Sequence, residues 1–165
     1  MNTAQHASAT ARFRAGPSVR DGGSLQSPAE TGGSPGRDSS ATLESFDATG
    51  GVVSGDELAA LLRGGVDEPM SMLARWIVRR AVLHLPCTAG ICLPKFQFDL
   101  ARHSVRPGVR ETIAALCGVF DDWELADWFT RPNNWIGNVS PAALIAADPN
   151  AVLHAARADR FVAMG

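Results

Sequence analysis

Apolar residues along the chain are concentrated after residue 50, where they recur mainly at helical spacing. Residues 1–50 are rich in Ser, Gly, Ala, Thr and Pro and have few large apolar side chains. Such a segment cannot bury enough apolar surface to offset the conformational entropy that folding would cost. We therefore expect a disordered N-terminal tail. In an alternative interpretation its Arg12, Arg14 and Arg20 form a basic arm that touches phosphates.

Two helices are predicted in the next segment. The first covers residues 54–63, because Ser54 and Glu57 have the spacing of a capping box. The second covers 69–83 and begins at Pro69, a residue suited to the first helical turn. Its apolar residues repeat at intervals of three and four and predict one buried stripe: Met70, Leu73, Ala74, Ile77, Val78, Ala81 and Val82.

The pattern changes to that of a strand after Pro86, which ends the long helix. Residues 87–98 contain a glycine turn, and Phe96 and Phe98 alternate around Gln97. Alternation bounded by turn residues is typical of a half-buried strand. We expect one small β-hairpin here, or a single strand that pairs locally.

Helices return in the last third of the chain, over 107–117, from 121 or 122 to 131, from 141 to 147, and from 149 onward. Asp121 or Asp122 is suited to cap the second of these, and Pro132 ends it. The polar corner that follows has residues that tolerate unusual backbone angles: Asn133, Asn134, Gly137 and Asn138. Three of the four tryptophans flank this corner, so we expect its aromatic surface to pack on the core or to bind another protein.

The predicted fold is therefore mainly α, a small helical bundle with one short β-hairpin and a disordered N-terminal tail. We divide the chain into a tail (1–50), a helix-turn-helix-like segment with the hairpin (51–105) and a C-terminal helical domain (106–165).

Charge differs between the two predicted ordered segments. Residues 63–110 have eight basic and three acidic side chains, a net charge of +5, whereas 111–165 have three basic and seven acidic, a net charge of −4. Two helices joined by a glycine turn resemble a helix-turn-helix unit, with the hairpin as its wing. Arg75, Arg79 and Arg80 fall off the apolar stripe of the second helix, so they are our candidate DNA contacts.

Other chemistry has little support. The three cysteines Cys87, Cys92 and Cys117 form no disulfide framework, so we expect a reducing, cytoplasmic location. No apolar run is long enough for a membrane helix. A zinc site of Cys87 and Cys92 with two histidines remains an alternative, but its spacing is irregular. We expect no catalytic residue, no metal and no cofactor, and so not an enzyme.

The polar corner carries a resemblance to a known family. Trp128-Phe129-x-x-Pro132-Asn133-x-x-Ile136-Gly137-x-x-Ser140-Pro141 is similar to the core motif of the Xre/MbcA/ParS-like antitoxin toxin-binding domain. The upstream run Leu93-Pro-Lys-Phe-Gln-Phe-Asp99 resembles a segment that often precedes that motif. At position 138 this chain has Asn where a second Gly is usual.

The resemblance implies an antitoxin that neutralises a RES-type toxin, an enzyme that consumes NAD⁺ or transfers ADP-ribose from it. It also implies DNA-binding autoregulation. The alternative is a DNA-binding transcriptional regulator whose C-terminal domain serves dimerisation, and in either case we expect a homo-oligomer. The residues expected to bind the partner are those of the motif: Trp128, Pro132, Asn133, Trp135, Ile136, Gly137, Ser140 and Pro141.

Overall fold

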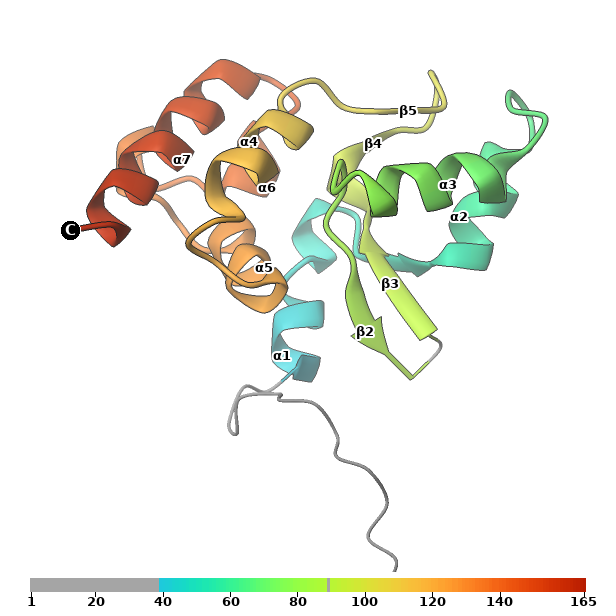
Figure 1. Ribbon diagram of the computed structural model, residues 1–165, viewed down its shortest axis with the longest axis horizontal. Helices are drawn as coiled ribbons and strands as arrows, with labels where there is room; N and C mark the ends of the chain where they lie inside the picture. Colours follow the sequence, from blue (N-terminus) through green and yellow to red (C-terminus); the bar gives the residue numbers. More distant parts are fainter. Residues whose placement is uncertain (1–38, 89) are drawn as a thin grey trace, which may run out of the picture. The chain divides into compact units, whose positions relative to one another are not determined.

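The computed structural model describes residues 39–88 and 90–165, which belong to one compact unit. The predicted tail up to residue 38, with its arginines, lies outside the described residues. Within the described ranges the fold is mainly α-helical, as expected (Figure 1). The helices are α1 (Ser39–Glu44), α2 (Gly55–Leu62), α3 (Pro69–Val78), α4 (Val109–Leu116), α5 (Asp122–Thr130), α6 (Pro141–Leu144) and α7 (Pro149–Ala163). The strands are β1 (Val52–Ser54), β2 (Leu85–Cys87), β3 (Gly90–Pro94), β4 (Phe98–Asp99) and β5 (Ser104–Val105).

The prediction that residues 1–50 are disordered is wrong for residues 39–50. This segment forms α1 and a 3-10 helix (Asp47–Thr49), and Phe46 is completely buried. The Phe46 ring stacks on Phe96, with ring centroids 5.8 Å apart, and Phe96 in turn contacts Phe129 at 4.8 Å. The segment therefore packs on an aromatic partner far away in the sequence, which its own composition does not reveal.

The strands form two small sheets, so the expectation of one hairpin is too simple. β2 and β3 are the predicted hairpin, and β1 adds to the other edge of β3, giving the order β1-β3-β2. β4 pairs separately with β5. Single strands of two or three residues have too little alternation to be recognised from the sequence.

A disulfide joins Cys87 to Cys92 across the hairpin. The expectation that the cysteines are unpaired is therefore wrong for these two, and so is the zinc alternative that needs their thiolates. Disulfides are rare in cytosolic proteins, which counts against the reasoning that led to a reducing compartment. No helix in the described ranges is long and apolar enough to cross a membrane.

The capping box of α2 forms as predicted. The Ser54 hydroxyl accepts a hydrogen bond from the Glu57 backbone N–H at 3.2 Å, and the Ser54 N–H donates to the Glu57 carboxylate at 2.8 Å. The Ser54 hydroxyl also donates to the Glu57 carboxylate at 2.9 Å. The bond from the Ser54 backbone N–H, and then the bond from its hydroxyl, hold the pKa of Glu57 below its ordinary value of 4.5. The box fixes the start of α2 at the end of β1.

Helix α3 is shorter than the predicted 69–83. It begins at Pro69 as expected but ends at Val78, and Arg80 adopts a left-handed conformation with φ 49°. The predicted stripe is therefore only partly correct: Leu73 and Val82 are buried, whereas Met70 and Val78 are exposed, Val78 by 83%. Because the helix ends early, Ala81, Val82 and Leu83 enter the core from the irregular segment between α3 and β2 rather than from a helix.

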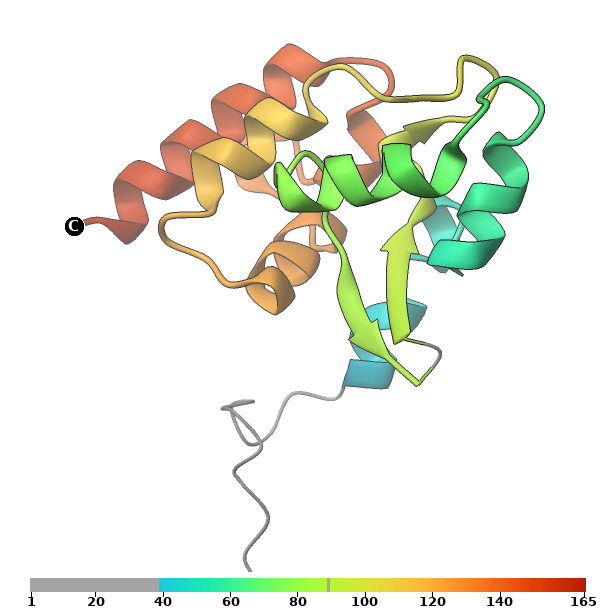
Figure 2. The same ribbon diagram turned by 45° about the vertical axis from the view of Figure 1, so that its right-hand side comes forward.

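Gln97 lies between two apolar cores. Its neighbour Phe96 belongs to the core formed mainly by α4–α7, and Phe98 belongs to the core under α2, α3 and the three-stranded sheet. Figures 1 and 2 show these two groups of elements on opposite sides of the unit. Gln97 itself is completely buried, in a 3-10 turn rather than the predicted strand. Its side chain accepts from the Leu83 N–H at 2.6 Å and donates to the Leu83 and Pro94 carbonyls at 2.9 and 3.0 Å.

We predict opposite effects for two buried polar side chains. Gln97→Leu leaves the Leu83 amide and carbonyl without partners inside the protein, so the free energy of unfolding should fall by about 2–4 kcal/mol. Thr112→Val removes a buried hydroxyl that has no hydrogen-bond partner in the structure, so stability should rise by up to about 1 kcal/mol. Urea unfolding followed by circular dichroism measures both. A Gln97→Leu value within about 0.5 kcal/mol of wild type would contradict the role given to this amide.

Candidate functional site

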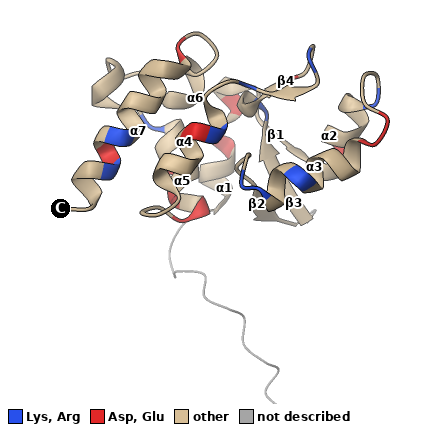
Figure 3. Ribbon diagram, turned by 45° about the horizontal axis from the view of Figure 1, so that its top comes forward, with Lys and Arg blue, Asp and Glu red and all other residues tan. Residues whose placement is uncertain are grey.

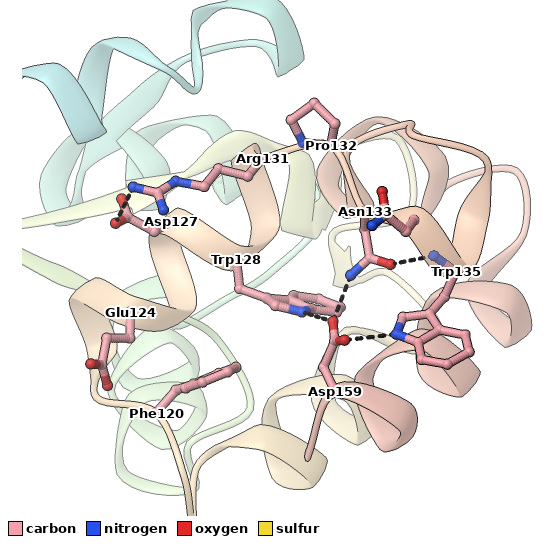
Figure 4. A pocket seen from close by; sticks show the side chains of 10 residues that line it. Phe120, Glu124, Asp127, Trp128, Arg131, Pro132, Asn133, Trp135 and Asp159 are labelled. Carbon is pink, nitrogen blue, oxygen red and sulfur yellow. Dashed lines mark hydrogen bonds and ion pairs between the residues drawn. The ribbon is translucent and has the colours of Figure 1, made fainter. Parts of the chain in front are cut away.

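Asp159, on α7, accepts hydrogen bonds from three side chains, one from α5 and two from the polar corner (Figure 4). The indole N–H groups of Trp128 and Trp135 donate to it at 2.7 and 2.8 Å, and the Asn133 amide donates at 2.6 Å. Hydrogen bonds to an ionised acceptor are stronger than those between neutral groups. One carboxylate therefore fixes the position of two tryptophans from different elements.

The N-cap of α5 fixes where this helix begins and therefore where Trp128 lies. Asp121 is the N-cap of α5, and its carboxylate accepts from the Glu124 N–H at 2.8 Å while the Glu124 side chain accepts from the Asp121 N–H at 2.9 Å. Of the two caps considered from the sequence, Asp121 is thus the one used. The helix ends at Thr130, before Arg131-Pro132, as predicted.

Asn133 organises the corner that follows. Its side-chain oxygen accepts from the Trp135 N–H at 2.9 Å, and its backbone N–H donates to the Val139 carbonyl at 3.0 Å. Gly137 and Asn138 adopt left-handed conformations with φ 71° and 61°. Asn is among the few residues other than Gly that enter this region readily. The departure from the family motif at position 138 is therefore compatible with the backbone that the corner needs.

A pocket of about 660 Å³ opens beside Asp159. Its walls combine aromatic rings with acidic side chains, and within it Arg131 pairs with Asp127 at 3.1 Å. Trp135 is 61% exposed although its indole N–H is bound. The lining residues are Phe120, Glu124, Asp127, Trp128, Arg131, Pro132, Asn133, Asn134, Trp135 and Asp159.

The predicted partner-binding residues separate into two groups. Trp128, Pro132, Asn133 and Trp135 line the pocket together. The other four shape the corner instead: Ile136 packs against the core, Gly137 makes the left-handed turn, Ser140 is the N-cap of α6 without a side-chain bond, and Pro141 is buried at its first position.

Sequence reasoning missed the central role of Asp159. A signal was present, because Val152, Ala155 and Ala156 are buried on α7 and Asp159 continues their stripe at the helical interval. A carboxylate on the buried side of a helix needs hydrogen-bond donors, and the nearby indoles and amide of the motif were the available donors.

The three candidate DNA contacts lie in different environments. Arg80 pairs with Asp122 of α5 at 2.7 Å, so its charge is partly neutralised by the acidic part of the chain. Arg75 and Arg79 are exposed and form no ion pair within the described residues. In Figure 3, basic residues mark α3 and the turn after it, and acidic residues mark α5.

We predict that Asp159→Ala loosens the corner more than removal of another acid. The variant leaves two indole N–H groups and the Asn133 amide without their acceptor. The free energy of unfolding should fall by about 2 kcal/mol. This loss is smaller than that of three fully buried hydrogen bonds, because Trp135 is exposed. The indole N–H signals of Trp128 and Trp135 should move in an NMR spectrum, while that of Trp76 stays in place. Glu111→Gln, which removes an exposed acid of α4, should change neither measurement.

Comparison with known proteins assigns no function to this site. No protein-family model matches the chain, and neither a curated protein nor a solved structure is significantly similar to it. The resemblance of the corner motif to antitoxin toxin-binding domains therefore stays a prediction made from the residues.

Proposed function

We propose that this protein is antitoxin-like and neutralises a RES-type toxin, one that consumes NAD⁺ or transfers ADP-ribose, through its C-terminal helical part. The observation that carries the proposal is the convergence of Trp128, Asn133 and Trp135 on Asp159. These three residues belong to the motif that resembles the toxin-binding domain, and the structure brings them to one pocket rather than dispersing them in the core.

Rigid aromatic side chains at an exposed site suit a protein partner. A tryptophan offers a large contact area and loses little conformational entropy on binding. Trp135 is already held by two hydrogen bonds, one from its backbone and one from its indole. Preorganisation of this kind lowers the entropic cost of association. The end of α7 adds exposed apolar surface at Phe161, Val162 and Met164, which extends the area available to a partner.

We predict that a neighbouring gene encodes a toxin of roughly 150–250 residues, the size of one compact enzyme domain. Co-expression of this protein should restore growth and cellular NAD⁺ in cells that make the toxin. Trp135→Ala should weaken rescue strongly, because truncating a tryptophan anchor commonly costs 2 kcal/mol or more, roughly a 30-fold loss of affinity.

Leu61→Ala is the matched control, since Leu61 is an exposed apolar residue of α2, outside the pocket. It should leave rescue intact. Absence of a RES-type neighbour together with no rescue on co-expression would refute the antitoxin function.

DNA binding is the second candidate function, favoured by the arrangement of α2, α3 and the sheet. The chain order is β1-α2-α3-β2-β3, so the hairpin β2-β3 follows the second of two consecutive helices. This order supports the proposal of a helix-turn-helix unit with a wing. Arg75 and Arg79 are exposed on and just after α3. Exposed arginines there are suited to phosphate contacts.

We predict that a fragment of the protein's own promoter is shifted in a gel, with an affinity that falls steeply as salt increases. The double variant Arg75→Ala, Arg79→Ala should reduce the salt dependence by about two phosphate contacts. Arg80→Ala should have a smaller effect, because Asp122 already neutralises part of its charge. Arg157→Ala, which removes an exposed arginine of α7, is the control, and no shift at low salt would exclude this function.

A further inference from the structure

The charge of Asp159 is not neutralised by a basic side chain. Its three hydrogen bonds come from neutral donors, and no ion pair joins it to a cation in the part of the chain that the structure describes. A carboxylate held by neutral dipoles keeps its full negative charge and attracts a cation, most strongly where water is partly excluded.

Asp159 also has a hydrogen-bonding position left. An ionised carboxylate has about four acceptor sites on its two oxygens. Trp128 and Asn133 both donate to Oδ2, whereas only Trp135 donates to Oδ1. Oδ1 therefore has the capacity to accept one further hydrogen bond.

The walls of the pocket are suited to a flat cation. Phe120, Trp128 and Trp135 supply three aromatic rings, and Figure 4 shows Phe120 and Trp135 on different sides of Asp159. Of the charged side chains in the lining, Arg131 pairs with Asp127, whereas the carboxylate of Asp159 accepts from neutral donors. A guanidinium stacks on aromatic faces and donates in its own plane to a carboxylate, whereas an ammonium is more strongly hydrated and does not stack.

We propose that this pocket receives an arginine side chain of the protein partner, with the guanidinium on the aromatic rings and one N–H donated to Asp159 Oδ1. A volume of about 660 Å³ is in the range of ligand pockets and holds such a side chain. The inference rests on the proposed function and deepens it, because it names the chemical group of the partner that the motif residues recognise.

The test uses the full chain and a short peptide as the probe, Ac-Gly-Arg-Gly-NH₂, observed through the four indole N–H signals in an NMR spectrum. Saturable shifts should appear for Trp128 and Trp135 with a dissociation constant on the order of 1 mM. Trp76 and Trp123, which lie outside the pocket, should not move and serve as internal controls.

Two matched peptides separate charge from shape. The citrulline peptide has the same shape without the charge and should bind about tenfold more weakly, as should the lysine peptide, which cannot stack. Equal binding of the citrulline peptide, equal binding of the lysine peptide, or no saturable shift at Trp128 and Trp135 would each overturn the proposal.

Two variants test the residues. Asp159→Asn should weaken peptide binding about tenfold. Because this change also disturbs the corner, Trp135→Ala is the second variant. The Trp135 side chain is mostly exposed, so the fold should persist, and peptide binding should weaken about fivefold. Glu111→Gln should bind as wild type does. Unchanged binding by Trp135→Ala would overturn the proposal. If the wild-type protein does not bind the peptide but still rescues cells from the toxin, only the arginine pocket is refuted. If it binds the peptide but does not rescue, only the antitoxin function is refuted.

Discussion

The buried amide of Gln97 is the interaction on which the rest of the fold depends. It satisfies both backbone polar groups of Leu83, where the chain leaves α3 and turns toward the hairpin. Unpaired polar groups are costly in the interior, so few other side chains could replace Gln97 at this position. With Gln97 fixed, Phe96 and Phe98 point into two different cores, and those cores hold the helices of both halves together.

Asp159 plays a comparable part at the surface. Like Gln97, it is a polar residue on the side of its element that faces the protein, and its hydrogen bonds connect segments distant in the sequence, here α5, the corner and α7. The two residues differ in how much of their polar side chain is left to bind a ligand. Gln97 has its amide oxygen and nitrogen engaged deep in the protein, whereas Asp159 lies beside an open pocket with its charge uncompensated. That difference is why the first is structural and the second is the centre of the proposed binding site.

The basic and acidic parts of the chain are not independent surfaces. The ion pair between Arg80 and Asp122 joins the end of α3 to the start of α5. Both side chains are partly exposed, so the pair contributes little to stability, but it partly neutralises the charge of Arg80. Any DNA contact through α3 then relies on Arg75 and Arg79, and the acidic start of α5 lies close to that helix.

The sequence by itself determined what depends on neighbouring residues. Local backbone chemistry predicts the capping box at Ser54, an acidic cap at Asp121 or Asp122, and the helix starts at Pro69 and Pro141. It also predicts the hairpin and the tolerance of Gly137 and Asn138 for left-handed conformations. Only the tertiary structure decided the rest. Phe46 stacks on Phe96, Cys87 forms a disulfide with Cys92, α3 ends early, and Asp159 accepts hydrogen bonds from donors more than twenty residues away. These outcomes depend on which segments meet in space, and residue patterns report the local preferences of the chain but not its distant partners.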